Sequence, residues 1–210
     1  MSVNRQSGYA GVDTVGEVNE IAEAGSGSSA VTPAQALLLC AFADTLDVDV
    51  DADPPEALSD PAALTTWLRR HNLVGADHRA DSEDLELALT LRSGLRDAMM
   101  RHHDRDQTAP VPDLDTAASA LPLRIVFDGT RPHLAPAIGG VRGGLARLLV
   151  AIAETQADDT WTRLKLCAAD ECQLAFYDTS KNRSRHWCSM GVCGNRQKTR
   201  TYRARQRARR

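Results

Sequence analysis

The chain has 210 residues, of which 42% are hydrophobic and 25% charged, values typical of a globular protein with an apolar core. It contains no apolar run long enough to cross a bilayer, and its first thirty residues lack the pattern of a signal peptide. We therefore expect a soluble cytoplasmic protein with no membrane partner. The abundance of Ala, Arg and Asp suggests a bacterium of high GC content.

Charge is distributed unevenly along the chain. Residues 163–210 carry 13 Lys and Arg but only three acidic side chains, whereas residues 1–162 carry 12 basic and 25 acidic ones. Such asymmetry is typical of a nucleic-acid-binding part joined to a part with another role. An acidic body that merely neutralises a basic tail would give the same pattern, but here the basic residues coincide with a metal-binding motif.

The chain is expected to begin with a disordered segment, residues 1–30, which is polar and rich in Gly and Ser. Thr32-Pro33 then predicts a helix start, with a hydroxyl N-cap followed by proline in the first turn. This helix is expected to reach about Leu46. The acidic segment 47–55, which contains two prolines, is expected to be a loop.

Two further helices are predicted, from Asp60-Pro61 to before Gly75 and from Ser82 to about His102, followed by a short helical turn over 114–120. Their apolar residues recur at three- and four-residue steps, so one face of each helix is expected to be buried. The residues of these faces are Leu64, Trp67 and Leu68 in the first helix and Leu87, Leu91, Leu95 and Ala98 in the second.

A β-hairpin is predicted after these helices, with strands at Leu123–Phe127 and Arg131–Leu134. The Asp128-Gly129 pair between them is a strong turn signal. A further helix over 141–156 follows, and its apolar side would pack against the other helices. The upstream part of the chain is therefore expected to be a mostly helical body with one hairpin.

The titratable residues of this body have ordinary structural explanations. His102, His103 and Asp104 could form a metal site, but neighbouring helix residues point in different directions, so a polar helix end is the favoured interpretation. His71 is explained as a helix-terminal side chain and Cys40 as a small core residue.

Four of the five cysteines lie within 27 residues of the C-terminal part, as two pairs with a four-residue gap each. This spacing lies within the range of zinc ligands, and two pairs of thiolates can bring two short loops to one tetrahedral ion. Disulfides, a redox dithiol and an iron–sulfur cluster are the alternatives; the reducing cytosol and the basic strand-and-helix context favour zinc. The predicted ligands of one structural zinc ion are Cys167, Cys172, Cys188 and Cys193.

The residues around the cysteines predict a treble-clef-like module of knuckle, hairpin and helix. Leu164–Leu166 reads as a strand, and the second cysteine pair runs directly into a helical sequence. Aromatic side chains would cover a core too small to fold without metal: Phe176, Tyr177 and Trp187. The expected fold class is α+β and mainly helical, with a helical domain over 31–160 and a small zinc domain over 161–210 that ends in a basic helix.

The second cysteine pair ends in the run Cys193-Gly194-Asn195-Arg196, and Phe176-Tyr177-Asp178 and Asn182-Arg183-Ser184-Arg185 precede it. These motifs resemble the CGNR zinc finger family. The upstream part is similar to the ABATE domain, which is usually fused to that finger. The residues that carry this second resemblance are Phe42 to Asp47, then Leu64, Trp67 and Leu68, then Leu91, Arg92, Leu95 and Arg96.

The resemblance implies a bacterial transcription regulator, related to stress, whose upstream domain senses a small-molecule effector or mediates assembly such as a homodimer. The chain departs from the family pattern at two positions. Asp44 stands where the family often has Asn, and His186 replaces an Arg often seen before Trp187. The first departure bears on any transferred ligand site, and the second removes a fixed positive charge from the expected binding face.

A strongly basic helix follows the cysteines. Its arginines recur at three- and four-residue steps along one side as far as Arg210, and Tyr202 is its only sizeable apolar side chain. Because no apolar face is available for packing, we expect phosphates to stabilise the helix and to order its distal end. The side chains predicted to contact nucleic acid are Arg183, Arg185, Arg196, Lys198, Arg200, Arg203, Arg205 and Arg207.

Two functional hypotheses follow. The first is a DNA-binding transcription regulator, favoured for duplex DNA by the family resemblance. The second is an RNA-associated or protein-interaction module whose zinc finger is only structural, since a few aromatic side chains could stack on bases. No phosphate loop or catalytic motif is present, so we predict no enzyme. In the upstream domain Asp44 and Trp67 are candidate pocket residues, although Trp67 also suits a core position and Asp44 a turn cap.

Overall fold

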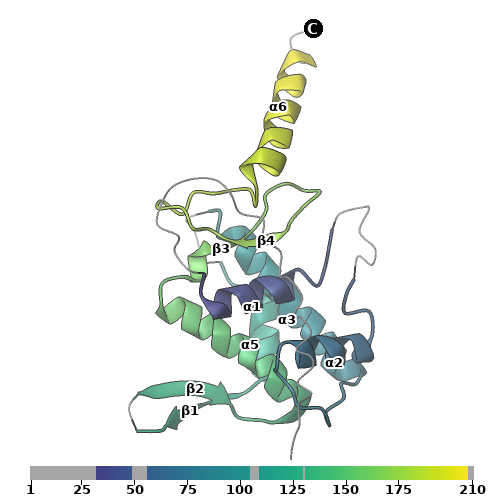
Figure 1. Ribbon diagram of the computed structural model, residues 1–210, viewed down its shortest axis with the longest axis vertical. Helices are drawn as coiled ribbons and strands as arrows, with labels where there is room; N and C mark the ends of the chain where they lie inside the picture. Colours follow the sequence, from purple (N-terminus) through teal and green to yellow (C-terminus); the bar gives the residue numbers. More distant parts are fainter. Residues whose placement is uncertain (1–31, 49–55, 105–108, 130, 208–210) are drawn as a thin grey trace, which may run out of the picture. The chain divides into compact units, whose positions relative to one another are not determined.

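The computed structural model describes residues 32–48, 56–104, 109–129 and 131–207. They form α-helices and two short antiparallel hairpins (Figure 1). In chain order the elements are α1 (Ala34–Ala43), α2 (Pro61–Arg70), α3 (Ser82–Arg101), α4 (Pro112–Ala120), β1 (Leu123–Phe127), β2 (Pro132–Pro136), α5 (Gly140–Ala157), η1 (Trp161–Arg163), β3 (Leu164–Leu166), β4 (Ala175–Tyr177), η2 (Met190–Gly194) and α6 (Asn195–Arg207). The expected fold class is confirmed.

Several expectations fall outside this part of the chain. The disorder predicted for residues 1–30, most of the loop at 47–55 and the side chain of Arg210 all lie outside the described residues. Among the helices that the structure describes, none is long and apolar enough to cross a membrane.

Leucine and alanine side chains of α1, α3 and α5 form the apolar core. Helix α1 packs on α5, α2 packs on α3, and α4 lies along α3. Burial of each Leu side chain stabilises the fold by roughly 1.5–3 kcal/mol. The predicted apolar faces are buried as expected, with Trp67 and Leu87 partly buried at their margins. The largest buried side chains of the helices are Leu39, Phe42, Leu64, Leu68, Leu91, Leu95, Met99, Leu145 and Leu148.

The predicted starts of α2 and α3 are confirmed, with aspartate caps. Asp60 accepts a hydrogen bond from the Ala63 N–H at 2.8 Å. Asp81 and Asp84 form a capping box, in which each carboxylate accepts from the backbone N–H of the other. These bonds satisfy N–H groups that have no partner within the helix.

The first helix is shorter than predicted. Pro33 rather than Thr32 occupies the N-cap, and no side chain caps the helix. The helix ends at Ala43 because the next residues take other partners: Thr45 donates its hydroxyl to the Phe42 carbonyl, and Leu46 forms a β-bridge with Glu56. Helix α4 is longer than predicted, since it begins at Pro112.

The predicted hairpin is present, but its return strand ends later. Phe127 pairs with Pro132, so the turn spans four residues and β2 runs to Pro136. Gly129 has φ of +111°, a conformation that glycine adopts without strain. The hairpin joins the body through β2, which packs on α5.

Two buried arginines of α3 hold the end of α1. Arg92 donates to both carboxylate oxygens of Glu56, at 2.7 and 2.5 Å, and to the Thr45 hydroxyl. Arg96 donates to the carbonyls of Ala43 and Leu46 at 2.9 and 3.3 Å. Arg96 therefore satisfies the last carbonyl of α1, which its own helix leaves free, while Arg92 fixes the residues that follow the helix through Thr45 and Glu56.

The strands of the zinc module extend the core of the body. Strand β3 packs on α3 and β4 packs on α1. Leu164, Leu166 and Ala175 belong to the same apolar cluster as the helices. The hairpin β3–β4 therefore depends on the body for its apolar partners, whereas the cysteines form a separate small cluster with Ala169 and Trp187.

Candidate metal centre and nucleic-acid interface

The four predicted zinc ligands meet at one point. The Sγ atoms of Cys167, Cys172, Cys188 and Cys193 all lie within 4.8 Å of one another. Cys172 Sγ lies 3.7 Å from Cys188 Sγ, which lies 3.8 Å from Cys193 Sγ. A tetrahedral ion with Zn–S bonds of about 2.3 Å requires sulfur atoms about 3.8 Å apart. The donor set therefore fits one tetrahedral zinc ion.

The same distances exclude the disulfide alternative. A disulfide needs sulfur atoms about 2.05 Å apart, and all four cysteines are free. Burial and the neighbouring Cys167 raise the pKa of Cys188, and burial raises the pKa of Cys193 to about 11. Zinc must displace protons from such thiols, so its binding depends on pH. The zinc is structural, because four thiolates leave no open coordination position.

Hydrogen bonds to backbone groups fix the two cysteine loops, residues 167–172 and 188–193. Cys167 follows β3 directly, and its N–H donates to the Leu174 carbonyl at 2.8 Å. Arg185 donates to the Cys188 carbonyl at 2.5 Å, and Ser189 accepts from the Val192 N–H at the start of η2. The strands thus flank the first cysteine pair, and the second pair leads through one π-helical turn into α6.

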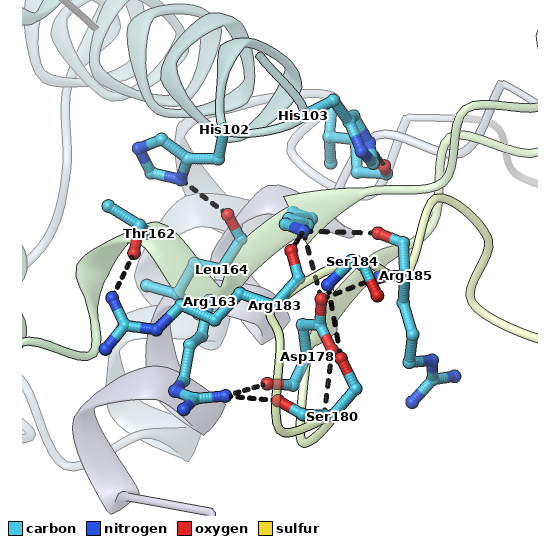
Figure 2. Close-up of polar contacts among 12 residues, drawn as sticks. His102, His103, Thr162, Arg163, Leu164, Asp178, Ser180, Arg183, Ser184 and Arg185 are labelled. Atoms are coloured by element: carbon cyan, nitrogen blue, oxygen red, sulfur yellow. Dashed lines mark hydrogen bonds and ion pairs between the residues drawn. The ribbon is translucent and has the colours of Figure 1, made fainter. Parts of the chain in front are cut away.

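A buried ion pair that bonds the segment before the second cysteine pair was not predicted. Lys165 Nζ lies 3.0 Å from the Asp178 carboxylate, and the two side chains are 2% and 0% exposed. Asp178 also accepts from the N–H groups of Ser180 and Arg185 (Figure 2). Lys165 also donates to the carbonyls of Arg183 and Arg185. Burial opposes ionisation of Asp178, but these donors lower its pKa.

This pair explains the sequence motif around Asp178. The segment 178–185 is a loop without apolar packing of its own, and the pair binds both its ends to β3. Arg163 adds bonds to the carbonyls of Asp178 and Ser180 at 2.8 and 2.9 Å (Figure 2). The signal for the pair was the lysine between Leu164 and Leu166, in a strand buried on both faces.

Arg183 and Arg185 make contacts within the protein. Arg183 forms an ion pair with Asp159 at 2.5 Å and donates to the Thr162 hydroxyl. The Arg185 guanidinium lies 5.2 Å from the centre of the Phe176 ring, besides its bond to the Cys188 carbonyl. Arg185 thus holds the second cysteine pair, whereas Arg183 joins segment 178–185 to the residues before β3. A contact with phosphate stays a prediction for both.

The basic side chains of α6 are arranged differently. No residue of the helix is buried, and its Lys and Arg side chains are all exposed as far as Arg207. The helix is continuous to Arg207. Backbone hydrogen bonds within the helix, and residues with good helix propensity such as Arg, Gln and Ala, support it. Ordering of its distal end by nucleic acid stays a prediction.

Glu171 was not predicted as part of the site. It lies in the first cysteine loop and accepts from Arg200 at 2.9 Å and from Arg196 at 3.5 Å. Asn195 donates to the Gly191 carbonyl, and a side chain at Gly194 would meet Met190 at 2.9 Å. The residues after Cys193 therefore set the direction in which α6 leaves the metal cluster.

The histidine pair connects the body to β3. His102 and His103 bond through ring nitrogens to the carbonyls of Leu164 and Leu166, both at 2.6 Å (Figure 2). Burial lowers the pKa of both histidines, so they are neutral donors at pH 7. His186 stacks on His103 with ring centres 5.0 Å apart. Their role in the structure is to hold β3 against α3.

Asp44 and Trp67 have different partners. Asp44 accepts from the Ala175 N–H of β4 at 2.7 Å, and burial raises its pKa to about 6, although this bond and Arg96 act to lower it. Trp67 packs between Phe42 and His71, with ring centres 5.2 and 4.2 Å apart. The structure thus gives Asp44 a contact with the zinc module and Trp67 a place at the edge of the core. A shared ligand pocket stays a prediction.

Comparison with known families agrees with this arrangement. Residues 163–206 match the CGNR zinc finger, and residues 36–163 match the ABATE family, described as "Putative stress-induced transcription regulator". The molecule is thus a zinc-finger protein with an upstream domain of a regulator family. The chain belongs to the ABATE family and carries a CGNR zinc finger after its ABATE domain. Neither family is an enzyme family. A comparison with curated proteins finds no match.

Proposed function

We propose that this protein is a zinc-dependent DNA-binding transcription regulator of the cytoplasm. The zinc domain, residues 161–210, would bind duplex DNA through α6. The upstream domain, residues 31–160, would mediate assembly or sense a ligand. Zinc held by the four cysteines fixes the base of α6, and the body fixes the strands behind it.

The observation that carries the proposal is the exposure of α6. A helix without a buried face gains nothing from packing, and one with six basic and no acidic residues repels itself. A polyanion would remove this repulsion. Arginine supports the same conclusion, because its planar group binds phosphate or guanine through two hydrogen bonds.

Helix geometry gives the basic residues two roles. At 3.6 residues per turn, Arg196, Arg200, Arg203 and Arg207 fall along one side, and Lys198 and Arg205 lie on the opposite side. A helix in the major groove has a phosphate backbone on each flank. The four-arginine side would therefore meet one backbone or the base edges, and the other two residues the second backbone.

The test uses the full zinc-loaded chain, because β3 and β4 pack on the body. Fluorescence anisotropy would measure its affinity for duplex DNA and for single-stranded RNA across a salt series. The variant carries Arg200→Ala, Arg203→Ala and Arg207→Ala. A matched control carries Arg70→Ala and Arg147→Ala, two exposed arginines of the upstream body.

With five or six phosphate contacts, log affinity for duplex DNA should fall with log salt at a slope of about −5. The triple variant should flatten this slope by about 2.7, at 0.9 per lost contact, and the control should leave it unchanged. Tighter binding to RNA would instead support the RNA-associated module. No binding by a chain that holds its zinc would contradict the role of α6 and leave the finger a structural element.

A further inference from the structure

The hairpin β1–β2 carries an apolar face that the body covers only at its Leu123–Pro136 end. Opposite residues of an antiparallel pair point to the same side of the sheet. One side of the hairpin therefore consists only of apolar residues: Leu123, Ile125, Phe127, Pro132, Leu134 and Pro136. Ile125 is 60% exposed and Phe127 79% exposed. These are large apolar surfaces for residues in a regular strand.

The hairpin also has one edge suited to pairing with a further strand. The described residues form no third strand beside β1 or β2. Strand β2 packs on α5 and contains two prolines, which lack the N–H group that pairing requires. Strand β1 has no proline, and its residues are β-branched or aromatic at three of five positions. Its outer edge is therefore the one open to another strand.

The sequence of β1 and its first turn residue is complementary to itself. In an antiparallel pairing of two copies centred on Val126, Arg124 of each copy lies opposite Asp128 of the other. Ile125 then lies opposite Phe127 on the apolar face. Arg124 and Asp128 are both exposed, and Asp128 faces only His133 within its own hairpin, at 3.5 Å. One two-fold axis therefore pairs both charges and both apolar residues.

We infer that the occupant of this edge is a second copy of the chain, and that two β1 strands pair antiparallel about Val126 to form a four-stranded sheet. The pairing puts each hairpin tip beside the base of the other hairpin. Gly129, which has no side chain, then lies opposite Leu123 of the second copy, where the partner's body begins. The side chain of each Phe127 then packs beside Ile125 of the second copy.

This inference rests on the assembly role proposed for the upstream domain, and it does not require DNA binding. Two paired strands of five residues bury less than the roughly 800 Å² per partner of a standard interface. A dimer with a dissociation constant of about 1–100 μM is therefore expected.

The experiment is sedimentation equilibrium of the full zinc-loaded chain, whose mass is 22.8 kDa, from about 1 to 200 μM. The variants are Arg124→Asp, Asp128→Arg and the exchange of both. Each single change places like charges opposite each other at both symmetric sites, and should weaken dimerisation about tenfold or more. The exchange restores opposite charges and should return the affinity toward that of the unchanged chain. Lys181→Asp, an exposed charge reversal outside the hairpin, is the control.

Two results would overturn the inference: a chain that stays monomeric at 200 μM, or an exchange variant no tighter than the single variants. Circular dichroism separates loss of pairing from loss of folding. Failure here leaves the DNA affinity of the monomer unchanged, whereas failure of the proposed function leaves sedimentation unchanged.

Discussion

The helical body and the zinc module are stabilised by different interactions. Leucine, alanine and methionine side chains fill the core of the body, and its buried arginines bond Glu56, the end of α1 and Gln173 of the zinc module. The module has two three-residue strands, an ion pair with almost no exposure and a cluster of four thiols. The apolar side chains of its strands pack against the core of the body. No residue of α6 is buried.

This difference shows how a segment of about forty residues can hold a fully exposed helix in place. A small core cannot offset the entropy of ordering its loops, so metal ligands and buried charges must fix them. Those interactions leave the surface free for basic residues. Loss of one surface contact should therefore change the stability of the body little. Loss of one cysteine ligand, or of one partner of the buried ion pair, should destabilise the module strongly.

The largest expected effect follows from loss of the metal. Structural zinc in small fingers contributes on the order of 10 kcal/mol or more. Cys188→Ser should therefore abolish protection from hydrogen exchange over the second cysteine loop and α6, while α3 and α5 keep theirs. Exchange measured by mass spectrometry, together with the zinc content, checks this. Cys40→Ser, at a part-buried site in the body, is the control and should retain one zinc per chain. Equal protection in both variants would contradict the prediction.

The second effect concerns the buried ion pair. Lys165→Met leaves the Asp178 carboxylate buried without its cation, which typically costs about 3–5 kcal/mol. Denaturant unfolding should show this as a lower free energy of unfolding. Arg142→Met breaks the ion pairs with Glu83 and Asp84 near the surface and should cost far less. Similar losses in the two variants would show that the module does not depend on its pair.

The third effect is a pH dependence at the contact between Asp44 and β4. Burial raises the pKa of Asp44 from 3.8 to about 6. Between these values the folded chain binds more protons than the unfolded chain, so stability falls as pH rises. Asp44→Asn keeps an oxygen for the Ala175 N–H and removes the charge. It should stabilise the chain at pH 7 by about 1–3 kcal/mol. It should also remove the contribution of Asp44 to the fall of the free energy of unfolding between pH 4 and 6.

Thermal unfolding at several pH values measures this effect. Arg96, Asp47 and Cys40 also face Asp44 electrostatically, and the substitution leaves them in place. An unchanged dependence of stability on pH would mean that burial imposes no cost on the ionised Asp44 carboxylate.

The smallest effect concerns Glu171, which pairs with two arginines of α6. If these arginines bind phosphate, Glu171 competes with DNA for them. Glu171→Gln should raise the affinity for duplex DNA about two- to fivefold at low salt, because exposed ion pairs are weak. Asp170→Asn is the control: it removes the same charge one residue away, where the described residues include no ion pair to α6, and should raise the affinity for duplex DNA less. Equal gains would indicate a general effect of charge.

The sequence by itself determined the parts whose signal is local. Cysteine spacing predicted the four ligands, and start residues and apolar periodicity predicted α3 and α5 nearly to the residue. The start of α2 was also predicted, but this helix ends at Arg70 rather than just before Gly75. The basic helix was predicted from its arginines alone. Each of these features depends on residues a few positions apart, so a single segment contains all the information needed.

Only the tertiary structure decided the contacts between distant segments. Asp44 meets Ala175, Lys165 meets Asp178, and His102 meets Leu164, across separations that no local pattern encodes. It also showed that Arg183 has a partner in Asp159 while the arginines of α6 stay exposed, a distinction absent from their sequence. The physical reason is that polar groups are satisfied by whichever donors or acceptors the packing of the core brings to them.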